Sequence, residues 1–364
     1  MRLTHRHHRL VALALLFAAV AMLISPAHAQ EKIEGKIDEK PALPDKTPVA
    51  IAKGTRVFIV SIDGARPDLL LLADAPNARH LMKTGSYSMW AQTIPIGKTL
   101  PSHTSMLTGV SMEKHGIFWN EDWLPRRVKQ GQEYPRWAPI FERAKEIGLT
   151  TAICAGKTKF EVLAKKETVD YLSVPEAPKT VPGPGGIRIP VLAKADENGF
   201  TEYDRKHSDD WVARNAEVII RQHKPQVMFV HFGRVDSAGH SKGWGSKQQL
   251  AAIEEADKAL GKVLDALRTA KVYDETLIIL SADHGGYGRG HDGKDPRGLH
   301  IPWIVAGPGI RKGYDLTQQS RLVISTMDTF ATACDFLGVK FKIDDEIEGK
   351  VIREAYEELR ATAP

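Results

Sequence analysis

The sequence predicts an α/β fold with a mostly parallel central sheet. Short apolar segments, typical of strands buried on both faces, alternate along the chain with longer segments of helical periodicity. This alternation is the pattern of units in which helices connect neighbouring parallel strands. The predicted strands are Arg56–Ile62, Leu149–Cys154, Gln226–Phe232, Thr276–Ser281 and Ile301–Ala306. The predicted helices are Pro76–Thr84, Trp137–Ile147, Asp209–His223, Ser246–Ala270 and Ser325–Leu337.

The strand predictions rest on continuous apolar runs. Arg56–Ile62 reads RVFIVSI, Thr276–Ser281 reads TLIILS, and Ile301–Ala306 reads IPWIVA. Runs of this length are too short for a typical helix, and their lack of alternation suits strands that are covered on both faces.

The helix predictions rest on apolar faces and on residues that begin or end helices. Ser246 and Gln249 form a capping box at the start of the longest predicted helix. One face of that helix is apolar and carries Leu250, Ile253, Leu260, Val263, Leu264 and Leu267. Gly85, Gly148 and Gly338 directly follow three other predicted helices, where glycine commonly ends a helix.

The chain is predicted to have three parts. Residues 1–29 have the pattern of a signal peptide, with three arginines, an apolar run and the cleavage motif Ala27-His28-Ala29. An uncleaved anchor is the alternative, but the apolar run Leu10–Ile24 is short for a bilayer span. Residues 30–53 are predicted to be a flexible lead-in, and residues 54–364 a single catalytic α/β domain with an irregular insertion near 175–202. We therefore expect an exported protein, periplasmic or secreted, without a membrane anchor after cleavage.

Charge and cysteine content exclude several classes of protein. Residues 1–29 contain three arginines and no acid, so without them the net charge falls from +5 to +2. A charge this small predicts no nucleic-acid polymer as a partner. Cys154 and Cys334 could form a disulfide in an exported protein, or could be two buried free thiols. Neither has a Cys or His neighbour at the spacing of a zinc finger. Nothing in the sequence indicates an oligomeric state.

Acids and histidines follow three of the predicted strands. Asp63 follows the first strand, Asp236 and His240 follow VMFVHFGRV, and Asp283 and His284 follow LIILSA, with His291 shortly after. The carboxyl ends of parallel strands meet at one edge of a sheet, where ligands bind. Asp and His together are typical ligands of zinc, and about six protein ligands suit two ions about 3.5–4 Å apart. Each motif alone could be an ordinary turn, but their convergence predicts a site for two divalent ions.

The segment GKTLPSHTSMLTG places Thr99 in a short turn before a predicted helix. A threonine hydroxyl is a weak nucleophile, but metal coordination would lower its pKa and activate it. The helix N-terminus beyond it would favour a phosphoryl anion. Thr99 is therefore the predicted catalytic nucleophile.

These motifs resemble the alkaline phosphatase superfamily, and in particular its type I phosphodiesterase/nucleotide pyrophosphatase branch. The resemblance rests on IVSIDGARPDLL, on KTLPSHTSMLTGVSMEKHGI with Asn120 shortly after, on VDSAGH, on SADHGG, and on GHDG before IPWIVAGPGI. The matching pieces extend from about residue 56 to 340, and their order is more specific than any one of them.

The resemblance implies a three-layer αβα sandwich that holds two divalent ions, most commonly zinc. It implies that Asp63, Thr99, Asp283 and His284 hold one ion and that Asp236, His240 and His291 hold the other. His300 is an alternative for the last histidine. The resemblance also implies a phospho-threonine intermediate on Thr99, and a catalytic role for the Asn120 amide at a non-bridging phosphoryl oxygen. His103, His115 and His231 are expected to pack or to support the ligands.

One departure from the branch concerns Lys157 and Lys159. The nucleotide hydrolases carry a W-P-G-S type loop where this chain reads CAGKTKF, which resembles the threonine-type phosphomonoesterases and phosphonoacetate hydrolases. Two cations there would suit the extra charge of a phosphomonoester, although surface lysines are common. We expect a hydrolase of small phosphate esters, acting on phosphomonoesters or on a broad range. The alternatives are a nucleotide pyrophosphatase/phosphodiesterase, a phosphonate hydrolase and a non-enzymatic metal or phosphate binder.

Overall fold

The computed structural model describes residues 56–121, 133–176, 180–182, 188–190, 207–291, 295–340 and 346–357. The predicted signal peptide and lead-in lie outside the described residues, as does most of the predicted insertion. Among the described residues, no helix is long and apolar enough to cross a membrane.

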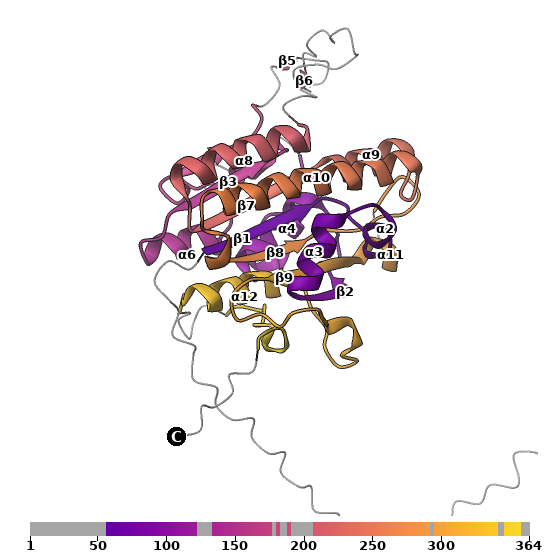
Figure 1. Cartoon of the computed structure of the whole chain (residues 1–364). Helices are drawn as coiled ribbons and strands as arrows, with labels where there is room; N and C mark the ends of the chain where they lie inside the picture. The colour runs from indigo at the N-terminus through magenta and orange to yellow at the C-terminus, as the bar shows by residue number, and fades with distance from the viewer. Residues whose placement is uncertain are drawn as a thin grey trace, which may run out of the picture. The chain divides into compact units, whose positions relative to one another are not determined.

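Eight strands form one mixed sheet at the centre of the described chain (Figure 1). Their order is β10 (Tyr314–Asp315), β2 (Ser86–Gln92), β9 (His300–Ala306), β8 (Thr276–Ser281), β1 (Arg56–Ile62), β7 (Val227–Phe232), β3 (Thr151–Ala155) and β4 (Tyr171–Ser173). β9 is antiparallel to both of its neighbours, β2 and β8, whereas every other neighbouring pair is parallel. The sheet is therefore mostly parallel, as the sequence predicts.

Helices cover both faces of the sheet and make the fold a layered α/β sandwich (Figure 1). They are α2 (Pro67–Leu72), α3 (Pro76–Thr84), α4 (Thr99–Thr108), α5 (Met112–His115), α6 (Ile140–Glu146), α8 (Asp209–His223), α9 (Arg234–Lys242), α10 (Lys247–Thr269), α11 (Pro296–Leu299) and α12 (Asp328–Leu337). α10 contacts α2, α3, α8 and α9, whereas α12 packs against α4. The central strands are consequently buried on both sides, which explains why β1, β7 and β8 are apolar almost throughout.

The longest helix shows how the sequence pattern becomes structure. Ser246 caps α10 by accepting a hydrogen bond from the Gln249 backbone N–H at 3.2 Å. The Gln249 side chain reaches back to the backbone N–H of Gly245, at 2.9 Å, rather than to that of Ser246. The predicted apolar face of α10 is buried, including Ile253, Leu260, Val263, Leu264 and Leu267.

Several predicted boundaries were wrong, for local reasons. β7 ends at Phe232, as predicted, but Asp236, which was expected at the end of this strand, lies in the first turn of α9. The helix expected from Trp137 begins at Ile140, after the cap residue Pro139. The helix expected from Ser325 begins at Asp328, whose carboxylate accepts a hydrogen bond from the Ser325 backbone N–H at 2.8 Å.

The predicted irregular insertion contains regular structure in its described part. β5 (Thr180–Pro182) and β6 (Arg188–Pro190) pair antiparallel as a separate two-stranded sheet. These two short strands were not predicted. The pattern was missed because each strand has only three residues and carries a proline.

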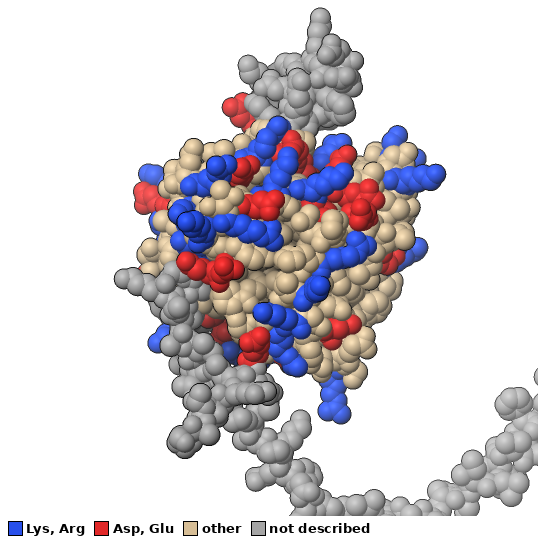
Figure 2. Space-filling view, viewed as in Figure 1, with Lys and Arg blue, Asp and Glu red and all other residues tan. Residues whose placement is uncertain are grey.

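The face that carries α8 and α10 has intermixed basic and acidic side chains (Figure 2). Asp210 of α8 pairs with Arg214 on the same helix at 2.9 Å, and with Lys262 of α10. Positive and negative side chains are interspersed on this face, as expected for a chain of small net charge.

Cys154 and Cys334 are both free and buried. The sequence left open a disulfide or two buried free thiols, and the structure shows two buried free thiols. Burial raises the pKa of the Cys154 thiol to about 12, and also raises that of Cys334. Neither thiol is exposed enough to react readily as a thiolate.

We predict that neither cysteine of the folded protein reacts with a chromogenic disulfide reagent within minutes at pH 8. In denaturant without reductant, about two thiols per chain should then react, because both become exposed. A titration that finds no thiol in denaturant would show that the cysteines form a disulfide, contrary to this structure.

Candidate active site

The predicted nucleophile lies at the start of a buried helix. Thr99 is the first residue of α4 and is 2% exposed. Lys98 precedes the helix in an extended conformation, and Pro101, which lacks an N–H, occupies the first turn, where none is needed. The Thr99 hydroxyl thus lies where the helix N-terminus favours a negative charge.

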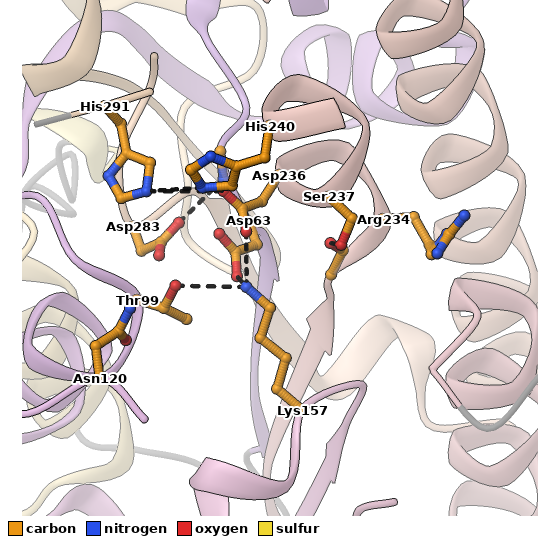
Figure 3. A network of polar contacts seen from close by, with 12 residues as sticks. Asp63, Thr99, Asn120, Lys157, Arg234, Asp236, Ser237, His240, Asp283 and His291 are labelled. Atoms are coloured by element: carbon orange, nitrogen blue, oxygen red, sulfur yellow. Dashed lines mark hydrogen bonds and ion pairs between the residues drawn. The ribbon is translucent and has the colours of Figure 1, made fainter. Parts of the chain in front are cut away.

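The predicted metal ligands fall into two groups at the edge of the sheet where the parallel strands end (Figure 3). Asp63, Asp283 and His284 form the first group, and all three are buried. Asp236, His240 and His291 form the second group. Within each group the potential ligand atoms lie within 4.8 Å of one another. The structure therefore brings together all six side chains that the sequence singled out as ligands from segments far apart in the chain.

A glycine lets the carboxylates converge. Gly64 follows Asp63 with φ +74°, a conformation that favours glycine. A Cβ atom at Gly64 would lie 3.0 Å from the Cα of Asp236. The Gly64 backbone N–H also donates a hydrogen bond to Oδ1 of Asp283, at 3.1 Å. The Asp63-Gly64 pair thus forms a turn. Because Gly64 has no side chain, this turn can lie close to Asp236, which brings the two groups together.

All three histidines of the two groups have the same orientation. Nδ1 of His240 donates to the carbonyl of Arg289 at 2.9 Å, and Nδ1 of His284 to that of Gly285 at 2.8 Å. Nδ1 of His291 donates to the carbonyl of Gly97 at 2.7 Å. Because a carbonyl can only accept, each Nδ1 carries a proton, and Nε2 is the nitrogen that each ring turns towards the site. Metal-binding histidines are typically fixed in this way.

The nitrogen and oxygen atoms that face each other within the two groups are arranged as ligands for cations. Nε2 of His240 lies 3.2 Å from Nε2 of His291 and 3.2 Å from Oδ1 of Asp236. Nε2 of His284, Oδ1 of Asp63 and Oδ2 of Asp283 are buried and have no hydrogen-bond partner among the described residues. Acceptors without donors are costly to bury. This donor set fits two divalent ions with Asp and His ligands, such as zinc.

Lys157 joins the two groups (Figure 3). Its Nζ lies 2.6 Å from Oδ2 of Asp63, 2.9 Å from Oδ2 of Asp236 and 3.4 Å from the Thr99 hydroxyl. The ammonium thus holds one oxygen of each carboxylate and leaves both Oδ1 atoms facing the histidines. The sequence predicted that Lys157 contacts substrate, but its contacts with the predicted ligands were not foreseen.

Burial and charge shift the pKa values of this cluster in opposite directions. Burial raises the pKa of Asp63, but the Lys157 ammonium and His231 outweigh it and hold that pKa well below its ordinary value. The pKa of Asp236 is lowered too, because Lys157 outweighs burial. Burial and the charge of Asp63 raise the pKa of Asp283 well above its usual range. Burial also lowers the pKa of His291 to about 4, which favours its neutral form.

Asn120 lies beside Thr99 (Figure 3). Its Oδ1 accepts hydrogen bonds from the Leu100 backbone N–H at 2.8 Å and from Nζ of Lys159 at 3.4 Å. Lys159 is 8% exposed and also donates to the Asn120 carbonyl. With its oxygen engaged, the Asn120 amide turns its N–H groups towards Thr99 (Figure 3). Lys159 therefore contacts the predicted oxyanion donor.

His300, the alternative last histidine, is not part of either group. Its ring stacks on Trp90 with 3.8 Å between centroids, whereas His291 joins Asp236 and His240. The resemblance favoured His291, which lies in the loop before β9, over His300, which is the first residue of β9.

Two further buried histidines support the site, as expected. His231 contacts Oδ2 of Asp63 at 3.0 Å. His103 contacts the Thr99 carbonyl through Nδ1 and the Ser61 hydroxyl through Nε2, both at 2.7 Å. Ser61 was missed, although its polarity inside the apolar run RVFIVSI was a signal.

Comparisons with known proteins identify the family of the chain. A family model described as type I phosphodiesterase / nucleotide pyrophosphatase matches residues 57–287. Human ectonucleotide pyrophosphatase/phosphodiesterase family member 5 is 25% identical over 234 residues, which are 63% of this chain and 44% of that protein. Mouse bis(5'-adenosyl)-triphosphatase is 24% identical over 234 residues, 63% of this chain and 47% of that protein. The chain thus spans about half the length of the curated relatives it matches.

Solved structures share the fold. Murine ectonucleotide pyrophosphatase/phosphodiesterase 5, an inactive variant in complex with AMP, superposes with a TM-score of 0.59 at 16% identity, over 79% of this chain and 96% of that one. The phosphonate monoester hydrolase of Agrobacterium radiobacter superposes with a TM-score of 0.54 at 17% identity, over 82% of this chain and 76% of that one. At these identities the likeness shows the fold alone.

We predict that Lys157→Met destabilises the metal-free protein by about 3–5 kcal/mol, because two buried carboxylates lose their shared cation. Lys165→Met is the control, since Lys165 is 53% exposed and its pair with Glu142 should contribute only about 0–1 kcal/mol. Urea unfolding at pH 8 in the presence of a chelator measures both. Equal stability of Lys157→Met and the parent would contradict the bridging role.

Proposed function

The chain belongs to the type I phosphodiesterase/nucleotide pyrophosphatase family, and from this premise we propose that it is a metal-dependent hydrolase of phosphoric esters with Thr99 as nucleophile. One observation carries the proposal. The Thr99 hydroxyl, at the N-terminus of α4, lies beside two groups of acids and histidines whose free acceptor atoms face one another. Metal ions held by these groups would activate the weak threonine nucleophile, and the helix N-terminus would favour the phosphoryl anion that it attacks.

The six acid and histidine side chains would hold two divalent ions, which we propose to be zinc. Asp63, Asp283 and His284, with the Thr99 hydroxyl, would hold one ion, and Asp236, His240 and His291 the other. When bound, the ions would supply positive charge that favours the ionised nucleophile and stabilises the phosphoryl oxygens.

The residues of the chain carry out two displacements in our proposal. The Thr99 oxygen forms a bond to phosphorus while the bond between phosphorus and the leaving-group oxygen breaks, which gives a phospho-threonine. Water then cleaves the phospho-threonine, so that one water is consumed for each ester and Thr99 is regenerated. The N–H groups of Asn120 would donate to a non-bridging oxygen in both steps. The Lys157 ammonium, 3.4 Å from the Thr99 hydroxyl, would stabilise the oxygen as it loses its proton.

We propose phosphomonoesters, or a broad range of small phosphate esters, as substrates. Lys157 is next to the nucleophile, and Lys159 is next to the amide that would bind a phosphoryl oxygen. Two cations there suit the extra negative charge of a monoester dianion. The second candidate is nucleotide pyrophosphatase/phosphodiesterase activity, which the family match and the activities named for the relatives favour.

The setting of the reaction is part of the proposal. The signal-peptide pattern in residues 1–29 supports action outside the cytoplasm on a soluble small molecule. No nucleic-acid polymer is expected to bind, because the net charge is small.

We predict that Thr99→Ala lowers kcat/KM for p-nitrophenyl phosphate by at least about 10³-fold, because the nucleophile is lost. Thr104→Ala is the matched control: Thr104 is a buried threonine of the same helix whose hydroxyl bonds the Leu100 carbonyl at 2.7 Å. That variant should keep most of the activity. Parent-like turnover by zinc-loaded Thr99→Ala would exclude Thr99 as the nucleophile.

The two substrate classes are separated by comparing p-nitrophenyl phosphate with the p-nitrophenyl ester of thymidine 5′-monophosphate. We predict about a hundredfold preference for the monoester, or about 2.7 kcal/mol. Lys159→Met should reduce that preference about tenfold, while Lys166→Met, which removes a surface lysine, should leave it unchanged. A hundredfold preference for the diester would instead establish the second candidate.

A further inference from the structure

The short helix α9 provides two of the three side chains of the second group. Asp236 and His240 are four residues apart on α9, so they share one face of the helix. Asp236 lies in the first turn, where helices fray most easily. The geometry of the second group therefore depends on how firmly the N-terminus of α9 is held.

α9 has no capping side chain of its own. Its cap residue is Gly233, and the helix begins directly after β7. The missing cap is supplied by Asp209 of α8. Oδ1 of Asp209 accepts hydrogen bonds from the backbone N–H groups of Gly233, at 2.8 Å, and of Arg234, at 3.2 Å. A carboxylate at this position satisfies two N–H groups that the helix cannot pair, and it also opposes the helix dipole.

Asp209 is not needed as a cap by its own helix. α8 is capped by Ser208, whose hydroxyl accepts a hydrogen bond from the Trp211 backbone N–H at 3.2 Å. Asp209 is 3% exposed, and its Oδ2 has no hydrogen-bond partner among the described residues. Burial raises its pKa to about 7, although the N–H groups of Arg234 and Gly233 lower it. Burying this carboxylate costs free energy, and its hydrogen bonds to the N-terminus of α9 are the main interactions that offset the cost.

We propose that Asp209 is a positioning residue that holds the N-terminus of α9 and thereby sets the geometry of Asp236 and His240 for metal binding. The metal part rests on the proposed function. Asp209 holds the backbone at Gly233 and Arg234, which are three and two residues before Asp236. Groups that hydrogen-bond to metal ligands typically change metal affinity about 10–100-fold when they are removed, and Asp209 acts one step further out, through the backbone of α9.

The chain offers a closely matched control in Asp257. This residue is also a buried aspartate, on α10, and it caps a different helix, α3. Its Oδ1 accepts from the Ala78 backbone N–H at 2.8 Å, and its Oδ2 from that of Asn77 at 3.0 Å. α3 likewise has no capping side chain of its own, and it carries none of the proposed site residues.

The first test is a zinc titration in competition with a chromophoric chelator, at a temperature where circular dichroism shows each variant folded. We expect the parent to bind two ions, and Asp209→Ala to bind one of them about 10-fold more weakly, at the lower end of the range for groups that contact ligands directly. Asp209→Asn, which keeps an acceptor oxygen, should recover part of the affinity. Asp257→Ala should bind both ions as the parent does. Parent-like affinities in Asp209→Ala, or an equal loss in Asp257→Ala, would overturn the proposal.

The second test needs no metal. Hydrogen exchange followed by mass spectrometry, with chelator present, should show faster exchange at residues 233–242 in Asp209→Ala and at residues 76–84 in Asp257→Ala. Unchanged exchange at 233–242 would overturn the positioning role, whatever the titration shows. If the parent binds no ion, the proposed metal-dependent function fails, while this measurement still decides whether Asp209 holds α9.

Discussion

Three carboxylates buried at one edge of the sheet are the constraint on which the rest of the site depends. Asp63, Asp236 and Asp283 are each at most 5% exposed. Negative charges in such a place are stable only beside cations or donors. The ammonium of Lys157 and the backbone N–H of Gly64 meet part of this need, and the two groups of proposed ligands would meet the rest by holding cations. The arrangement thus follows from one electrostatic requirement.

Backbone carbonyls decide how the histidines meet this requirement. The carbonyls of Gly97, Gly285 and Arg289 each accept from one Nδ1, so they determine which nitrogen is left for the site. These carbonyls belong to loops rather than to strands or helices. The protonation pattern of the site is therefore determined by loop conformation.

The sequence predicted what depends on local pattern and on the general geometry of parallel sheets. Strands such as β1 and β8 are apolar runs, and the acids that follow them converge because strand ends meet at one edge. Features that depend on side-chain reach or on distant pairing were not predictable. The Lys157 ammonium spans two groups only because its stem is long, and Asp209 caps a helix 24 residues further along the chain. Asp236 was placed at a strand end because nothing in VMFVHFGRV marks Gly233 as the start of a helix.

The single reversed strand has a consequence for the evolution of the site. β8 and β9 are antiparallel neighbours, so the segment between them leaves and returns at the same edge of the sheet. A parallel neighbour would require a crossover to the opposite edge, usually through a helix. Asp283, His284 and His291 therefore sit on one connection that both starts and ends at the site. An insertion in this connection would therefore add chain beside the site without changing the order of the strands.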